Sequence, residues 1–275
     1  MKNLSALFNQ GVFKVLKESF SLYFKNIFRL LEIVAWITLP ASIFFVLIFY
    51  WGLPEQALYA LGAISYPTVF ILLLVLNAAL IKTIQATEEG KIVGTLSVYA
   101  SVFALFGSYL WVLTLAALRI MLWALPFISF CLISLRLNVR APFWLFSLAL
   151  LFLAPVFIAV CQYSFSPLAF LIDGRKGSEA LAESKKIIKP NFWKFLGNIF
   201  VLFLIMTPLD GQIYQWMDKV VTTPLTAMNL FPLLLFNCLI NLLAVTVNVF
   251  PTVFFYFLYK EFQNQCYLME TTTAK

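Results

Sequence analysis

Residues 141–172 read APFWLFSLALLFLAPVFIAVCQYSFSPLAFLI, a stretch of 32 residues without a charged side chain. About 20 residues suffice for a helix to cross the hydrocarbon core of a bilayer. A charged side chain near the middle of such a helix is costly, so long uncharged stretches mark candidate spans. This stretch predicts a helix that crosses a membrane.

The rest of the chain repeats the pattern. Of its 275 residues, 63% are hydrophobic, only 11% are charged and 30 are Phe. A typical soluble domain is about 25% charged, and a soluble globule of this size could not bury so much apolar surface. The composition excludes an intrinsically disordered chain, a secreted disulfide scaffold and a nucleic-acid-binding module. Further uncharged stretches cover 33–54, 56–81, 92–118, 120–135, 195–209 and 220–259.

Arg119 separates two of these stretches, which form either one long span or two short ones. If the two stretches form one span, 15 Lys and Arg residues lie on the side of the membrane that holds both termini, and 3 lie on the other side. Two spans would move the 172–194 loop, with its six Lys and Arg residues, to the opposite side, against the positive-inside rule. The sequence therefore predicts an all-α, polytopic membrane helix bundle with six transmembrane helices and both termini in the cytoplasm. The predicted spans are 27–50, 61–84, 105–135, 143–170, 193–212 and 230–258.

Two segments with amphipathic periodicity precede the first and the fifth span. They align at an offset of 165 residues, so that Glu18-Ser19 matches Glu183-Ser184 and Asn26 matches Asn191. A weaker copy occurs near residue 100. The alignment predicts one transmembrane domain over 1–275 with three repeats, each an interfacial helix followed by two spans. The alternative is that any multi-span protein alternates amphipathic and apolar segments. The predicted repeats are 1–90, 91–172 and 173–275.

Residues 164–203 carry a more specific pattern, SFSPLAFLIDGRKGSEALAESKKIIKPNFWKFLGNIFVLF. The pattern resembles the membrane domain found beside some bacterial glycerophosphoryl diester phosphodiesterases and in related bacterial integral membrane proteins. In that family, a span ends in a turn made of an acidic residue and a glycine. A helix follows, and it leads to two aromatic residues and then a basic residue. The corresponding positions here are Asp173-Gly174, Ala180-Leu181, Ser184, Lys189, Asn191 and Phe192-Trp193-Lys194.

The resemblance implies a protein of the bacterial inner membrane, but the phosphodiesterase activity does not carry over. In the fused members of that family, chemistry belongs to a separate soluble domain with metal-binding acids and histidines. This chain has no histidine, and Pro190 stands where the family more often has Gly. The four cysteines show no metal-binding spacing. We expect no enzymatic activity, no catalytic residue, no cofactor and no metal site.

Polar residues inside spans are the default candidates for a functional site. Arg119 is the foremost of them, because a charge near the centre of a span costs about 2.5–3.5 kcal/mol on insertion scales. It serves either as a cation that faces a bundle cavity and holds a lipid phosphate, or as a structural residue whose side chain reaches the interface.

Amides form a second set of candidates. Asn237, Asn241 and Asn248 share one face of the last span, at about 100° per residue. They line a polar pathway or make hydrogen bonds between helices, of which the second is the more common role. Asn77 and Gln162 are isolated polar residues in other spans. Arg29 and Glu32, three residues apart, are expected to form a local ion pair.

Two functions from different classes fit these features. The first is a lipid-associated protein for lipid handling or envelope homeostasis, whose basic flanks attract anionic headgroups; the net charge of +7 then needs no nucleic acid. The second is a membrane scaffold that recruits a cytoplasmic protein through the basic face of 172–194. The lysines of that face are Lys185, Lys186, Lys189 and Lys194.

Overall fold

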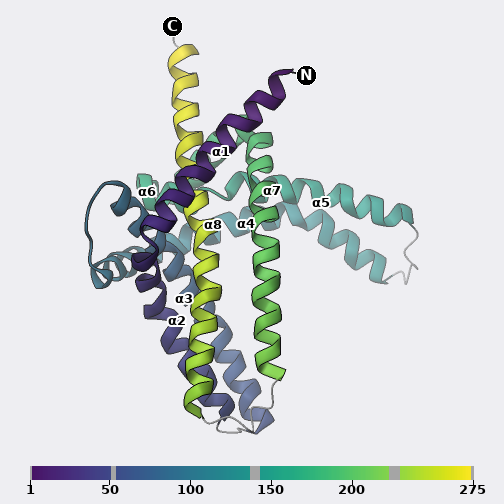
Figure 1. Cartoon of the computed structure of the whole chain (residues 1–275). Coiled ribbons are helices and arrows are strands. Elements are labelled where there is room, and N and C mark those ends of the chain that lie inside the picture. The colour runs from purple at the N-terminus through teal and green to yellow at the C-terminus, as the bar shows by residue number, and fades with distance from the viewer. Residues whose placement is uncertain (1, 51–53, 137–142, 223–229, 274–275) are drawn as a thin grey trace. The chain divides into compact units, whose positions relative to one another are not determined.

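The structure, a computed structural model, describes residues 2–50, 54–136, 143–222 and 230–273, with some side chains inside these helices left undescribed. Secondary structure in these ranges consists of helices joined by short turns, without strands, which confirms the all-α class for them. Eight helices follow one another there (Figure 1). They are α1 (Lys2–Lys25), α2 (Ile27–Tyr50), α3 (Glu55–Glu88), α4 (Thr95–Arg136), α5 (Phe143–Tyr163), α6 (Ser166–Asp173), α7 (Ser178–Thr222) and α8 (Leu230–Thr273).

Five segments of the described residues are long and apolar enough to cross a membrane, and each overlaps one of the first five predicted spans. The sixth predicted span, 230–258, falls in α8, where many side chains lie outside the described residues. Six spans therefore stay a prediction. The five segments are Ile27–Phe44, Ala63–Glu88, Thr95–Leu132, Leu151–Asp173 and Ser178–Leu209.

The third uncharged region forms one helix, α4, which continues past Arg119 and Pro126. No break separates the weak copy of the amphipathic pattern near residue 100 from the rest of the helix. Large apolar side chains of α4 point outward, as Trp111 at 57% and Leu122 at 65% exposure show. A helix that is apolar and exposed on most of its surface suits a lipid environment rather than water.

Two compact units divide the chain. Unit 1 contains residues 1–104 and 196–261, and unit 2 contains residues 105–195 and 262–275. The helices α4, α7 and α8 each contribute to both units. The prediction of a single domain with three repeats is not tested by this division.

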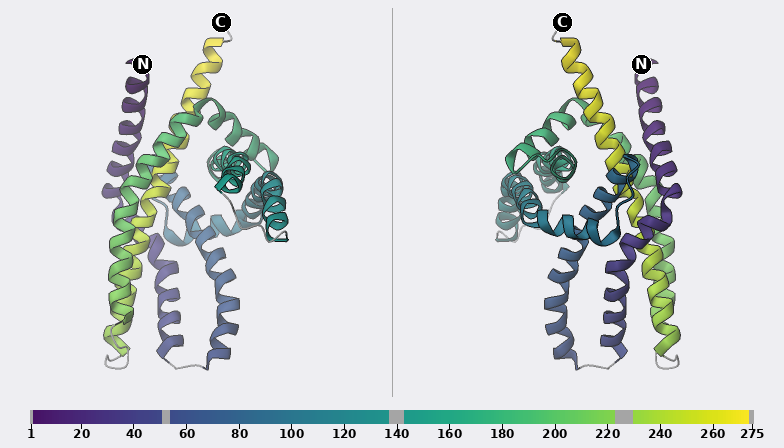
Figure 2. Two further views of the ribbon diagram at one scale, coloured as in Figure 1. Left: turned by 90° about the vertical axis from the view of Figure 1, so that its right-hand side faces the viewer. Right: turned by 90° about the vertical axis from the view of Figure 1, so that its left-hand side faces the viewer.

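In unit 1, α2 and α3 lie side by side and run in opposite directions (Figures 1 and 2). Helix α1 meets α2 at Asn26 and runs beside α8, where the rings of Phe20 and Tyr23 lie 4.5 and 5.7 Å from that of Phe250. Buried side chains from several helices, α1 among them, form the core of this unit. They include Leu30, Ile33 and Val34 of α2, Val75, Ala79 and Ile84 of α3, and Val253, Phe254 and Tyr256 of α8.

In unit 2, the break between α5 and α6 is held by a side chain of α7. The fully buried Ser184 hydroxyl donates to the carbonyl of Gln162 at 2.6 Å and accepts the backbone N–H of Phe165 at 3.1 Å. These two backbone groups are left without helical partners where the chain turns. Gly174, with φ of 69°, then ends α6 in the left-handed conformation that favours glycine.

An asparagine marks a helix junction in each unit. Helix α7 bends at Asn191, whose φ of −106° and ψ of 15° are not helical, directly after Pro190. Proline lacks the N–H that would continue the helical ladder. The Asn191 side-chain amide donates to the carbonyl of Ile187 at 3.2 Å, and that of Asn26 donates to Leu22 at 3.0 Å.

Candidate functional site

Helix α1 presents three kinds of surface around its axis. A buried face packs into unit 1, and a polar face lies opposite to it. A line of exposed phenylalanines runs along one border of the polar face. The buried residues are Val12, Val15, Leu16, Ser19 and Tyr23; the polar ones are Lys14, Lys17, Glu18, Ser21 and Lys25; the exposed phenylalanines are Phe13, Phe20 and Phe24.

A groove of about 600 Å³ runs along the other border of that polar face. Three lysines and one glutamate line it, so its potential is positive. The groove lies where α1, the end of α3 and α8 meet. The distribution of Lys and Arg residues predicts that these segments share one side of the membrane. The lining of the groove is Lys14, Lys17, Glu18, Ser21, Leu22, Lys25 and Asn26, with Thr87 of α3 and Phe257 of α8.

Two ion pairs from neighbouring residues of α8 hold the walls of this groove. Glu261 pairs with Lys14 of α1, and Lys260 pairs with Glu88 of α3, each at 2.7 Å. The hydrogen bond and the charge of Glu261 raise the pKa of Lys14 above its ordinary value. Helix α8 is thereby fixed to α1 and to α3 at the same level along its axis.

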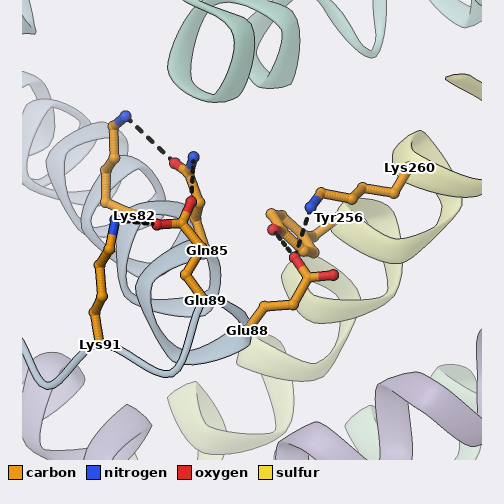
Figure 3. A network of polar contacts seen from close by, with 7 residues as sticks. All are labelled: Lys82, Gln85, Glu88, Glu89, Lys91, Tyr256 and Lys260. Atoms are coloured by element: carbon orange, nitrogen blue, oxygen red, sulfur yellow. Dashed lines mark hydrogen bonds and ion pairs between the residues drawn. The ribbon is translucent and has the colours of Figure 1, made fainter.

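Glu88 is the centre of a wider polar network at the end of α3, which Figure 3 shows. The hydroxyl of the fully buried Tyr256 donates to the same carboxylate oxygen that Lys260 contacts. The ammonium of Lys260 also lies 5.4 Å from the centre of the Tyr256 ring. The sequence carries no signal for these residues, because only the fold brings α3 and α8 together here.

The turn after α3 carries a second, separate group of polar contacts (Figure 3). Lys91 binds Glu89 at 2.6 Å, and Gln85 donates to Glu89 at 3.2 Å. The hydrogen bond and the charge of Lys91 hold the pKa of Glu89 below its ordinary value. The turn itself needs Gly90, whose φ is 71°.

Arg119, the foremost candidate from the sequence, lies exposed on α4 in unit 2. It does not line the groove, and it makes no hydrogen bond or ion pair with the described residues. Its role in lipid binding stays a prediction.

The amide residues lie apart from the groove as well. The side chain of Asn77 donates to the carbonyl of Leu73 at 3.1 Å and accepts the hydroxyl of Thr252 at 3.2 Å. Thr252 stands four residues after Asn248, so the asparagine face of α8 continues to a contact with α3. The Asn248 side chain donates to the carbonyl of Ala244 at 2.9 Å. Asn241 is half-buried, and the side chain of Asn237 lies outside the described residues.

The candidates around 172–194 belong to unit 2. Gln162 is half-buried and takes part through its backbone carbonyl, which accepts the Ser184 hydroxyl. Lys194 is half-buried, and its ammonium donates to Gln265 at 3.1 Å. The lysines of that face which are exposed are Lys185, Lys186 and Lys189.

The predicted ion pair between Arg29 and Glu32 is wrong. The guanidinium of Arg29 donates to the carbonyl of Val93 at 2.7 Å, and Glu32 accepts the hydroxyl of Thr95. Both side chains therefore bind the segment that leads into α4. Spacing along one helix predicted a local partner, whereas the fold supplies partners 64 and 63 residues away.

Comparison with protein families, with curated proteins and with solved structures finds no match to this chain. The resemblance to the phosphodiesterase-associated membrane domain stays a prediction.

Proposed function

We propose that this chain is a multi-pass protein of the bacterial inner membrane that associates with anionic phospholipids and serves lipid handling or envelope homeostasis. The proposal assigns it no catalytic step. It takes the chain to cross the bilayer six times with both termini in the cytoplasm, and to be built from three related repeats.

The observation that carries the proposal is that the exposed surface of α1 has a basic part and an aromatic part side by side. Lysines and phenylalanines occupy adjoining strips of it, where Lys17 stands four residues after Phe13 and three residues before Phe20. Helices at a membrane surface combine these two features, because aromatic rings enter the boundary of the acyl chains while ammonium groups meet phosphates. Each lysine near an anionic surface contributes about 1 kcal/mol to binding.

Lipid association predicts that the protein retains anionic phospholipid when it is purified. The full chain should be extracted in a mild detergent, and its co-purified lipids quantified by mass spectrometry. The ratio of anionic to zwitterionic phospholipid is expected to exceed that of the source membrane several-fold. A ratio equal to that of the source membrane would contradict the association.

Support for the repeat comes from the two asparagine junctions. Asn26 and Asn191 stand at matching positions of the sequence alignment, and each donates its side-chain amide to the carbonyl four residues earlier. The serines seven residues before them, Ser19 and Ser184, are both fully buried.

The six-span topology predicts the location of both ends of the last span. A fluorescent protein fused after Lys275 is expected to fluoresce, because that fold matures in the cytoplasm. Alkaline phosphatase inserted after Lys219 is expected to be active, because that enzyme requires the periplasm. Phosphatase activity from a fusion after Lys275 would place the C-terminus in the periplasm and contradict the proposed topology.

A further inference from the structure

We propose that the groove beside α1 binds the phosphate-bearing headgroup of an anionic phospholipid, with the ammonium groups of Lys17 and Lys25 as its main ligands. The inference rests on the proposed lipid association and gives it a site. None of the residues that the sequence singled out for lipid binding lines this groove.

The three lysines of the groove differ in whether they already have a partner within the protein. Lys14 is paired with Glu261 at 2.7 Å, which satisfies much of its charge. Lys17 and Lys25 also line the groove but make no hydrogen bond or ion pair with the residues that the structure describes. Their two positive charges outnumber the single negative charge of Glu18, so an anion is the complementary ligand.

The spacing of these groups suits a headgroup rather than a point charge. Lys17, Ser21 and Lys25 follow one another at intervals of four residues and form a line along one side of α1. The line is about 12 Å long at 1.5 Å per residue. Two lysine side chains at its ends can close on one phosphate or hold two phosphates of one headgroup, and the Ser21 hydroxyl supplies a donor between them.

The apolar part of the lining favours a lipid over a free phosphate ion. Leu22 of α1 and Phe257 of α8 border the groove together with its polar groups. A hydrated phosphate ion gains nothing from such surfaces, whereas the glycerol and the first acyl carbons of a phospholipid bury apolar area against them. The exposed phenylalanines of the same helix fit the same surroundings.

The groove is also formed before any ligand arrives. The pairs Lys14–Glu261 and Lys260–Glu88 fix α1 and α3 to successive residues of α8. A ligand therefore does not have to order these walls, and less binding free energy is lost on reorganisation.

The test uses the purified full chain in detergent, titrated with short-chain phosphatidylglycerol and observed by native mass spectrometry. The wild-type protein is expected to bind phosphatidylglycerol in preference to phosphatidylcholine. In the variant K17Q/K25Q, binding should weaken roughly 10- to 30-fold, because two lysine–phosphate contacts are lost. Since both lysines are exposed, the melting temperature of this variant should equal that of the wild type.

Two further variants distinguish binding at the groove from an effect of the net charge of the protein. K176Q/K189Q removes the same charge from exposed lysines of unit 2 and is expected to bind like the wild type. K17R/K25R keeps the charges and should retain binding. Equal weakening in K176Q/K189Q would overturn the site, since it would show an effect of net charge alone.

The remaining outcomes distinguish the site from the function it rests on. If the wild type prefers phosphatidylglycerol and K17Q/K25Q binds it equally well, the groove is not the site, while lipid association stands. A wild type without that preference overturns both. Inorganic phosphate should not displace the lipid at equal concentration, and displacement would assign the groove to free phosphate instead.

Discussion

Replacing Ser184 with alanine is expected to lower the free energy of unfolding by about 1–3 kcal/mol. The Ser184 hydroxyl donates to the carbonyl of Gln162 and accepts the N–H of Phe165, at 2.6 and 3.1 Å. Both backbone groups lie at the break between α5 and α6, and alanine leaves them unpaired. The side chain is fully buried, so bulk water does not replace the lost hydroxyl. Thermal unfolding of the detergent-purified protein, followed by tryptophan fluorescence, measures the loss as a lower melting temperature.

The matched control is Ser108→Ala on α4. This change removes the same hydroxyl from an exposed position, and it should shift the melting temperature little. Equal melting temperatures for S184A and S108A would show that the α5–α6 break does not depend on Ser184.

Replacing Glu88 with alanine is expected to destabilise the protein by about 1–2 kcal/mol, mainly through Tyr256. The ion pair with Lys260 contributes less, because the side chains of Glu88 and Lys260 are 34% and 35% exposed and solvent screens them. Tyr256 is fully buried in the wild type, and Glu88→Ala removes the acceptor of its hydroxyl. Thermal unfolding again provides the measurement.

A double-mutant cycle isolates this hydrogen bond. E88A/Y256F should be about as stable as E88A alone, since Tyr256→Phe removes the hydroxyl that E88A leaves unpaired. Glu88→Gln keeps an acceptor for Tyr256 and should be destabilised less than E88A. Additive losses in E88A and Y256F would mean that the two side chains do not act on each other. Glu89→Ala, at the exposed neighbouring position, serves as the control.

The apolar helices could be predicted from the sequence because the spacing of charged residues along the chain determines where they lie. Charges are excluded from the hydrocarbon core, so the distance between charges gives the length of a span. Five predicted spans overlap apolar helices of the structure for this reason. The same logic placed the N-terminus, the end of α3 and the C-terminus on one side, and side chains of all three line or border the groove.

The groove itself could not be predicted. Its frame depends on Glu88 and Tyr256, which are 168 residues apart, and no periodicity connects them. In the sequence, polar residues within the predicted spans are the candidates, and Arg119 is the foremost of them. The charged residues that the fold gathers lie instead outside the uncharged stretches, where charges are common and no single one stands out.

The length of helix α4 restricts how it can cross a membrane. At 1.5 Å per residue its 42 residues extend about 63 Å, twice the roughly 30 Å of a hydrocarbon core. A single crossing of the proposed membrane therefore requires that α4 tilts or that its ends extend beyond the hydrocarbon core.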